Sequence, residues 1–206
     1  MKSLHRKYLI IFFFLMTLTG CQPTIANRDS SGTTVVCFGD SLTAGYGAAA
    51  GHDYPSLLAQ KIALPVINAG VSGNTTADAL ARLDTDVLSH NPKMVIITLG
   101  ANDFFQNLPE KETLANMKKI IEAIKSHGAM VVWAEVRMGL WWDPYLKDFK
   151  GLAQREHILL IPNILRGIID NPALKYDQIH PNDEGYKIMA KRIYNYIKSY
   201  LPTETK

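Results

Sequence analysis

Apolar runs alternate along this chain with segments in which apolar residues recur every three or four positions. The runs are rich in β-branched residues and predict strands at Val35–Phe38, Pro65–Asn68, Met94–Leu99, Met130–Ala134 and Ile158–Ile161. The periodic segments predict helices at Tyr54–Ile62, Thr76–Leu88, Glu110–Ser126, Pro144–Arg155 and Pro181–Tyr200. Alternation of strands and helices is typical of βαβ units. The pattern therefore predicts an α/β fold around a parallel sheet.

Finer features of the pattern place individual elements. Val95–Leu99 and Met130–Trp133 are almost continuously apolar, as central strands covered on both faces are. The helix that ends at Ser126 is followed by Gly128, a residue suited to a helix C-cap. The last helix is predicted to begin with Pro181 in its first turn.

The start of the chain has the pattern of an export signal. A basic segment, Met1–Lys7, precedes an apolar run over Tyr8–Leu18 that is too short to span a bilayer, which takes about 20 residues. Leu18-Thr19-Gly20-Cys21 then resembles a bacterial lipobox, which implies cleavage before Cys21 and lipidation of that cysteine. The alternatives are an ordinary signal peptide and a buried cysteine in a tail.

This N-terminus divides the chain into three parts. We expect residues 1–20 to be a lipoprotein signal peptide, residues 21–32 a lipidated flexible tether without apolar periodicity, and residues 33–206 a single domain. The lipid anchor at Cys21 implies a membrane as partner and a location on the periplasmic face of a bacterial membrane. Gln22 resembles the residue found in lipoproteins of the outer rather than the inner membrane.

Charge and cysteine content narrow the function classes. The full chain carries 22 basic and 19 acidic residues, and residues 1–20 hold three of the basic ones, so the remainder is formally neutral. No basic run indicates nucleic acid as a partner. Cys37 lacks a disulfide partner and lies in an apolar strand pattern, which favours a small core residue over a reactive thiol.

Metal and cofactor motifs are missing from the sequence. There is no His-Glu-x-x-His or Cys-x-x-Cys, and the glycines near the first strand lack the lysine and spacing of a phosphate-binding loop. We therefore expect no metal and no cofactor. The histidines at positions 52, 90, 127 and 157 have no paired spacing and are expected to be solvated.

Polar residues with catalytic potential follow several of the predicted strands. Ser41 comes directly after the first strand, and Asp177-Gln178-Ile179-His180 lies near the other end of the chain. A serine hydroxyl becomes a useful nucleophile when an imidazole takes its proton, and a carboxylate orients that imidazole. The Gly-x-Ser-x-Gly elbow of α/β-hydrolases is absent. Ser41, Gly73 and Asn102 all follow carboxyl ends of strands, the edge where open α/β sheets bind ligands.

Four separated segments resemble the sequence blocks of the SGNH subgroup of GDSL-type hydrolases and occur in the same order: Gly39–Gly47, Asn68–Thr76, Gly100–Asp103 and Asp177–Asn182. The resemblance implies a flavodoxin-like, three-layer α/β/α sandwich with a five-stranded parallel sheet. It implies Ser41 as nucleophile, His180 as base and Asp177 as its partner. The oxyanion donors would be the backbone N–H groups of Ser41 and Gly73 and the side-chain amide of Asn102.

Two other carboxylates lie inside these blocks. Asp40 is adjacent to the nucleophile and cannot readily stand behind an imidazole that contacts Ser41, so we expect it to hold its loop through backbone N–H groups. Asp103 receives the same structural interpretation.

The substrate is the least determined part of the prediction. Leu-Thr-Ala-Gly-Tyr-Gly and Val-Ser-Gly-Asn-Thr are similar to segments of small bacterial thioesterases, arylesterases and lysophospholipases. Leu140, Trp141 and Trp142 follow the fourth strand and are predicted to form an apolar wall beside the site, or else to cover the core.

We therefore expect a serine hydrolase of acyl esters or thioesters, acting on small-molecule or lipid esters through an acyl-enzyme. The alternatives are an O-acetyl esterase of cell-envelope glycans and a non-catalytic lipoprotein that binds lipids or glycans. Retention of all five proposed site residues argues against the non-catalytic alternative. The oligomeric state is left open.

Overall fold

The computed structural model describes residues 24–137 and 143–202, without the side chains of residues 143–147. Its strands are β1 (Thr34–Gly39), β2 (Val66–Gly70), β3 (Pro92–Thr98), β4 (Met130–Ala134) and β5 (Leu159–Ile161). They form a sheet in the order β2-β1-β3-β4-β5, and every neighbouring pair is parallel. The predicted parallel sheet is confirmed, and each predicted strand overlaps an observed one.

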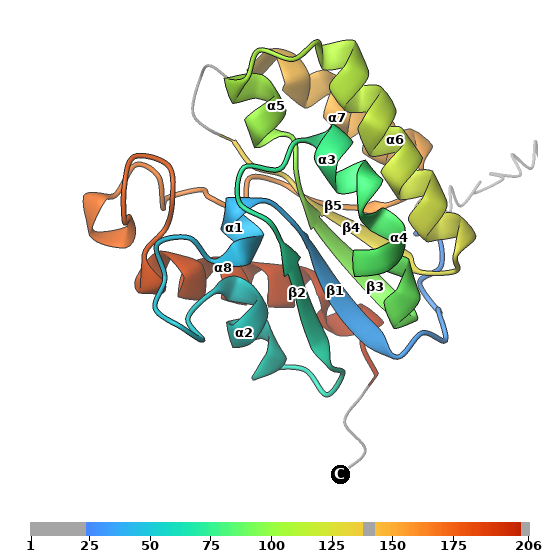
Figure 1. Ribbon diagram of the computed structural model, residues 1–206. Helices are drawn as coiled ribbons and strands as arrows, with labels where there is room; N and C mark the ends of the chain where they lie inside the picture. The colour runs from blue at the N-terminus through green and yellow to red at the C-terminus, as the bar shows by residue number, and fades with distance from the viewer. Residues whose placement is uncertain (1–23, 138–142, 203–206) are drawn as a thin grey trace, which may run out of the picture.

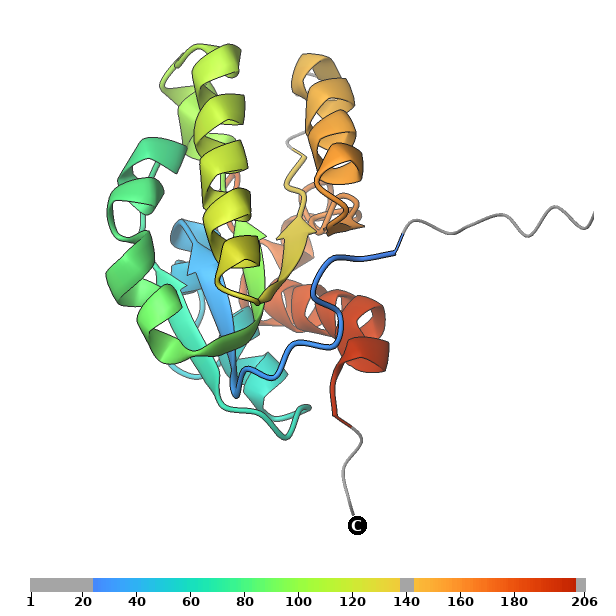
Figure 2. The same ribbon diagram turned by 90° about the vertical axis from the view of Figure 1, so that its right-hand side faces the viewer.

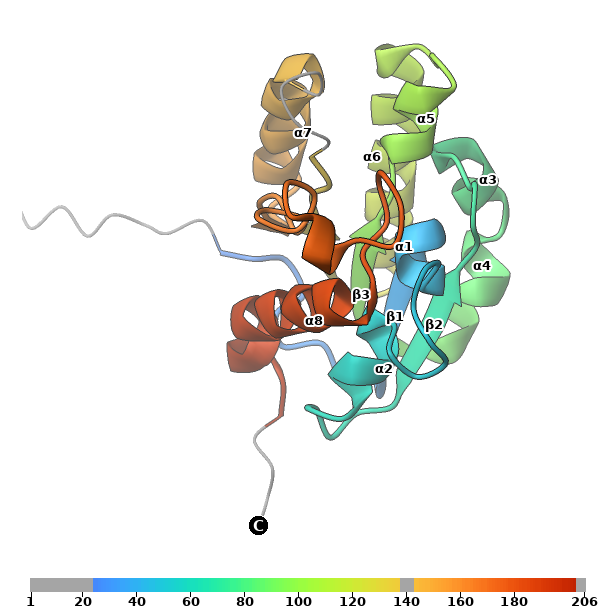
Figure 3. The same ribbon diagram turned by 90° about the vertical axis from the view of Figure 1, so that its left-hand side faces the viewer.

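Helices cover both faces of this sheet. One face carries α3 (Thr76–Ala81), α4 (Leu83–Asp86), α6 (Glu110–Ser126) and α7 (Asp143–Arg155). The other carries α2 (Tyr54–Ala59) and α8 (Asp183–Ile197), which pack against each other. Figures 2 and 3, turned to either side, show the sheet enclosed between these two helical layers. The three-layer α/β/α sandwich is therefore confirmed.

Two very short helices follow strands at the carboxyl edge of the sheet (Figure 1). They are α1 (Ser41–Ala44), after β1, and α5 (Ala101–Phe105), after β3. Single 3-10 turns occupy Leu88–His90, Pro172–Leu174 and Lys198–Tyr200. The sequence did not predict α1 or α5, because four or five residues are too few to show a helical period.

The predicted helix over Thr76–Leu88 is wrong in its continuity. It breaks at Arg82, whose φ of −111° and ψ of 7° depart from helical values. The Arg82 guanidinium reaches down to the backbone carbonyls of Gly39 and Ala69, at the ends of two strands. These tertiary hydrogen bonds keep Arg82 close to the sheet. A continuous straight helix would carry it away from these carbonyls.

The last predicted helix is also shorter than expected. Pro181 pairs with Lys175 in an isolated antiparallel bridge and does not enter the first turn. Asn182 is instead the N-cap, since its side-chain oxygen accepts the Gly185 N–H. The helix ends at Ile197 and gives way to a 3-10 turn. Similarly, α2 ends at Ala59, three residues before the predicted end.

The core lies on both sides of the central strands. Val35–Phe38 of β1 and all of β4 are buried, as the continuous apolar runs predict. Trp133 packs against Phe149 of α7, with ring centroids 4.8 Å apart. Cys37 is fully buried, and this burial raises the pKa of its thiol, which confirms that it is a small core residue.

The segment predicted to be a flexible tether is packed against the domain from Ile25 onward. Ile25 contacts the core, and the Ala26 N–H donates to the His157 carbonyl at 2.8 Å. The Asn27 side-chain amide donates to the carbonyls of Lys125 and Ala129, at the turn that follows α6. The expectation of free chain up to residue 32 is therefore wrong, because polar loop residues donate hydrogen bonds to carbonyl groups of the domain.

None of the helices described is long and apolar enough to cross a membrane.

Candidate active site

Strand β1 delivers Ser41 to the carboxyl edge of the sheet through a tight turn. The buried Asp40 is the N-cap of α1, and its side chain accepts the Leu42 N–H at 3.0 Å, so Ser41 becomes the first residue of that helix. Gly39 allows the turn, because a Cβ there would stand 2.1 Å from the Thr98 hydroxyl and 2.2 Å from that of Thr43. The Ser41 side chain is thereby fixed at the edge.

The loop before α8 brings an imidazole and a carboxylate to this hydroxyl. The Ser41 Oγ lies 2.9 Å from Nε2 of His180, and Nδ1 of His180 lies 2.8 Å from Oδ2 of Asp177. A carboxylate beside Nδ1 favours the tautomer with the proton on that nitrogen. Nε2 is then free to accept the Ser41 hydroxyl proton. The chain of contacts from hydroxyl to imidazole to carboxylate is complete.

Local hydrogen bonds hold the His180 loop in shape. The Asp177 Oδ1 accepts the N–H groups of both Ile179 and His180, each at 2.8 Å. Burial raises the pKa of Asp177, but these two N–H groups and the imidazole outweigh it and hold the pKa below its usual value. The carboxylate is therefore ionised at neutral pH. Tyr46 lies against the imidazole, with ring centroids 4.6 Å apart.

Asn102 joins this arrangement from the first turn of α5. Its side-chain amide donates to the Asn74 carbonyl at 2.9 Å, which uses one of its two hydrogens and fixes the orientation of the amide. Asn74 is held in turn by Arg82, whose Nε donates to the Asn74 Oδ1 at 2.6 Å. Together with Ser41 and His180, Asn102 lines a small pocket of about 20 Å³.

Gly73 lies on the loop from β2 to α3 at the same edge of the sheet. It is exposed and has a φ of 84°, a conformation that favours glycine. A Cβ at this position would meet no atom within 4 Å, so the space around its backbone is open. Gly73 is not among the residues that line the pocket beside Ser41. Among the described site residues, the pocket therefore brings together Ser41, Asn102 and His180, with Asp177 behind.

Asp103 has the structural role that the sequence predicted. It is 1% exposed and accepts hydrogen bonds from the backbone and hydroxyl of Thr76 and from the hydroxyl of Thr113. These bonds tie α5 to α3 and α6. Asp103 thus positions the helix that carries Asn102 and makes no contact with His180.

Asp40 is likewise structural, and its burial has a consequence for stability. Burial raises the pKa of its carboxyl from 3.8 to about 7, against the opposing effect of the Leu42 N–H. The folded protein therefore binds this proton more tightly than the unfolded chain does. The free energy of unfolding is expected to fall as the pH rises from about 4 to about 7, by at most about 4 kcal/mol from this group.

The substitution Asp40→Asn tests this linkage. Asparagine keeps an oxygen for the Leu42 N–H but cannot ionise, so this part of the pH dependence is expected to disappear. Urea unfolding at pH 5 and pH 8 measures the difference, with the exposed Asp84→Asn as control. An equal loss of stability between the two pH values in wild type and Asp40→Asn would contradict the assignment.

Several pocket residues were missed by the sequence analysis. Phe105, Val136 and Ile179 line the pocket beside Ser41, and Phe105 is 46% exposed. Tyr46 is the residue against the imidazole. Their proximity to the motifs was a usable signal for Tyr46, Phe105 and Ile179, since each lies within or next to a block. Leu140, Trp141 and Trp142, predicted to form an apolar wall, lie outside the described residues.

Within residues 24–137 and 143–202, no group of three or more histidine, cysteine or acidic side chains could hold a metal ion. The four histidines expected to be solvated are exposed. One of them, His52, lies 2.8 Å from the Asp183 carboxylate on the surface.

Comparison with known proteins agrees with this geometry. Residues 37–188 match the model of the GDSL-like Lipase/Acylhydrolase family. An arylesterase of Vibrio mimicus is 32% identical over 178 residues, covering 81% of this chain and 89% of that protein. Thioesterase 1/protease 1/lysophospholipase L1 of Escherichia coli (strain K12) is 28% identical, covering 87% of this chain and 86% of its own.

A solved structure shares both fold and sequence with this chain. The psychrotrophic esterase EstA from Pseudoalteromonas sp., in a structure inhibited by monoethylphosphonate, superposes with a TM-score of 0.73 and 26% identity, covering 82% of this chain and 98% of its own. The segment that matches the family model, residues 37–188, contains Ser41, Asn102, Asp177 and His180. The chain belongs to the GDSL-like lipase/acylhydrolase family and is an ester-hydrolysing serine hydrolase.

Proposed function

We propose that Ser41, His180 and Asp177 are the catalytic triad of this hydrolase. The observation that carries the proposal is the pair of contacts at 2.9 and 2.8 Å that links the three side chains. His180 Nε2 takes the hydroxyl proton as the Ser41 Oγ attacks the ester or thioester carbonyl. The imidazolium passes that proton to the departing alcohol or thiol, which leaves an acyl group on Ser41. Water, deprotonated by His180, then releases the carboxylic acid and restores the hydroxyl.

The oxyanion formed in each step requires donors already in place. We assign this role to the backbone N–H groups of Ser41 and Gly73 and to the side-chain amide of Asn102. The second hydrogen of the Asn102 amide supports the assignment, since only one is used by the Asn74 carbonyl. Arg82 acts through Asn74 and is a positioning residue.

The proposed substrates are acyl esters or thioesters of small molecules or lipids. Relatives named arylesterase and thioesterase/lysophospholipase support this class. The apolar side chains of Phe105, Val136 and Ile179 beside Ser41 also suit an acyl group. We propose that Leu140, Trp141 and Trp142 extend this apolar surface.

A chain-length series tests the acyl preference. If Trp141 and Trp142 line the acyl site, kcat/KM should rise from acetyl towards longer nitrophenyl esters, with each methylene worth at most about 1–3 kcal/mol. Replacing both tryptophans with alanine should flatten the gradient and spare acetyl ester turnover. An unchanged profile in the double variant would return both residues to the core. Faster release of acetate from an acetylated glycan than from any nitrophenyl ester would favour glycan deacetylation.

We further propose that the mature protein begins at a lipidated Cys21 and stands on the periplasmic side of a membrane, the outer one if two are present. The basic start, the short apolar run and the lipobox-like end of the leader support this. Two or more acyl chains give stable anchoring where one is marginal, at about 0.8 kcal/mol per buried CH₂.

Mass spectrometry of the membrane-extracted protein is expected to find Cys21 as the N-terminal residue, with added acyl mass. The variant Cys21→Ser is expected to lose the lipid and the cleavage before residue 21. An unmodified Cys21, or a mature chain that starts elsewhere, would refute the anchor and leave the catalytic proposal untouched.

A further inference from the structure

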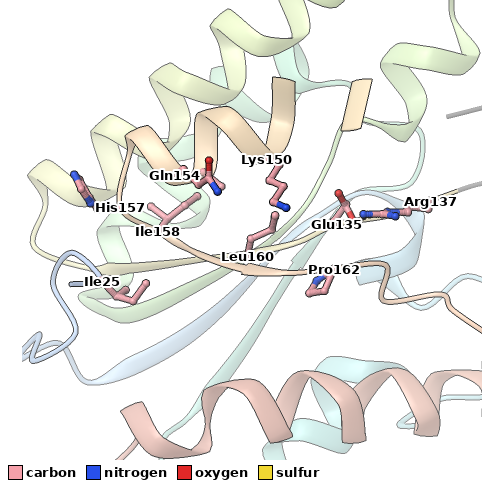
Figure 4. Close-up of a pocket in the computed structure, with 10 residues that line it drawn as sticks. Ile25, Glu135, Arg137, Lys150, Gln154, His157, Ile158, Leu160 and Pro162 are labelled. Atoms are coloured by element: carbon pink, nitrogen blue, oxygen red, sulfur yellow. Dashed lines mark hydrogen bonds and ion pairs between the residues drawn. The ribbon is translucent and has the colours of Figure 1, made fainter. Parts of the chain in front are cut away.

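A second cavity lies away from the triad, between α7 and β5. It has a volume of about 320 Å³, far larger than the pocket beside Ser41 and within the range of small-molecule sites. Figure 4 shows Lys150 of α7 on one side and Leu160 on the other, with Glu135 and Arg137 at one end and Ile25 at the other. The packed N-terminal segment thus forms one wall.

The chain after β4 separates the two cavities. Val136 lines the pocket beside Ser41, whereas its neighbours Glu135 and Arg137 line the larger cavity. A ligand in the larger cavity would therefore contact a different set of side chains from an acyl group on Ser41.

Glu135 gives the cavity a hydrogen-bond acceptor that lacks a donor in the part of the chain that the structure describes. Its side chain is 2% exposed, and Oε2 accepts hydrogen bonds from Nε of Arg137 at 2.6 Å and from the Asn163 N–H at 3.0 Å. The other oxygen, Oε1, is buried without a hydrogen-bond partner among the described residues. Leaving a buried acceptor unsatisfied costs free energy, so a donor supplied by a ligand would be bound favourably.

The surrounding charges and surfaces select the rest of the ligand. Arg137 already neutralises the charge of Glu135, so this end of the cavity offers a hydrogen-bond acceptor without an uncompensated charge. Lys150 is exposed and can stay solvated. Ala153, Ile158 and Leu160 make the body of the cavity apolar. The complementary molecule has an uncharged hydrogen-bond donor at one end of an alkyl chain.

We propose that this cavity binds a hydroxyl-headed single alkyl chain, with its O–H donating to Oε1 of Glu135 and its chain running along Leu160 towards Ile25. A free primary alcohol and a 1-O-alkylglycerol share this chemistry. The site is separate from the triad and does not depend on the catalytic proposal.

Matched probes test the donor requirement on the purified full-length protein; neither probe carries an acyl group that Ser41 could attack. Titration calorimetry with 1-octanol and with methyl octyl ether compares two chains of which only the alcohol can donate. The alcohol is expected to bind at least about tenfold more tightly, the effect of a hydrogen bond to a charged acceptor. Equal affinity, or tighter binding of octanoate than of octanol, would overturn the proposal. 1-O-Octylglycerol, measured alongside, shows whether the free alcohol or the glyceryl head is preferred.

Variants of the cavity locate the binding. In Glu135→Gln, the amide oxygen can keep the Arg137 and Asn163 contacts while the NH₂ faces the cavity and donates to either probe, so the preference for the alcohol should be lost. Leu160→Trp should fill the cavity and weaken octanol at least tenfold. Leu159→Trp, on the opposite face of the same strand, is the control and should bind as wild type does. Undiminished octanol binding in a folded Leu160→Trp protein would place the probe elsewhere and sink the proposal.

Discussion

Replacing Ser41 with alanine is expected to lower kcat for ester hydrolysis by at least about 10⁴-fold while leaving the fold intact. The reason is that the Ser41 Oγ, in contact with His180 Nε2, is the proposed nucleophile. The measurement is turnover of a nitrophenyl ester, together with thermal unfolding to check the fold. Ser126→Ala, at an exposed serine at the end of α6, is the control and should keep wild-type kcat. Undiminished turnover in Ser41→Ala would end the triad assignment.

His180→Ala is expected to cost about as much, and the double variant should be little worse than either single one, because triad members act as a unit. Losses that multiplied in the double variant would mean that the two residues act in independent steps. Fluorophosphonate labelling gives a separate readout. It should fail in Ser41→Ala and be slowed strongly in His180→Ala, since the hydroxyl there lacks its base.

Replacing Asn102 with alanine is expected to lower kcat by about 10²–10³-fold with little change in KM, as loss of a transition-state donor does. The geometry behind this is the amide fixed by the Asn74 carbonyl at the pocket it shares with Ser41. Steady-state kinetics on one nitrophenyl ester checks it, with Gln106→Ala, at the exposed C-cap of the same helix, as control. A variant that lost only KM would move Asn102 from the oxyanion hole to substrate binding.

The sequence predicted the sheet better than the helices, for a physical reason. Buried parallel strands are apolar on both faces, so continuous apolar runs such as Val95–Leu99 and Met130–Trp133 can be recognised as strands from the sequence. Helix continuity depends on tertiary contacts, and the hydrogen bonds of Arg82 to strand carbonyls break one predicted helix. No period in the sequence shows where a guanidinium will find its acceptors.

The candidate site was predicted from motifs, and its supporting residues were not. Ser41, Asn102, Asp177 and His180 stand in short blocks whose chemistry is legible residue by residue. Val136 lies outside these blocks and reaches the site through the arrangement of loops, which sequence patterns do not encode. Glu135 lies directly after a buried strand, and no sequence pattern marks it. Its importance depends on which of its oxygens found partners.

The packed start of the domain changes how such an enzyme would meet its substrate. Under the proposed acylation of Cys21, only three residues separate the lipidated cysteine from Ile25, which packs against the core. At about 3.6 Å per extended residue, the four steps from Cys21 to Ile25 span at most about 14 Å, whereas twelve free steps to residue 33 would span about 43 Å. The start of the hydrolase domain would then lie within about 14 Å of the membrane surface. The enzyme would meet a lipid substrate by diffusing along the membrane surface. The rate of encounter would depend on the density of substrate in the membrane rather than on its concentration in solution.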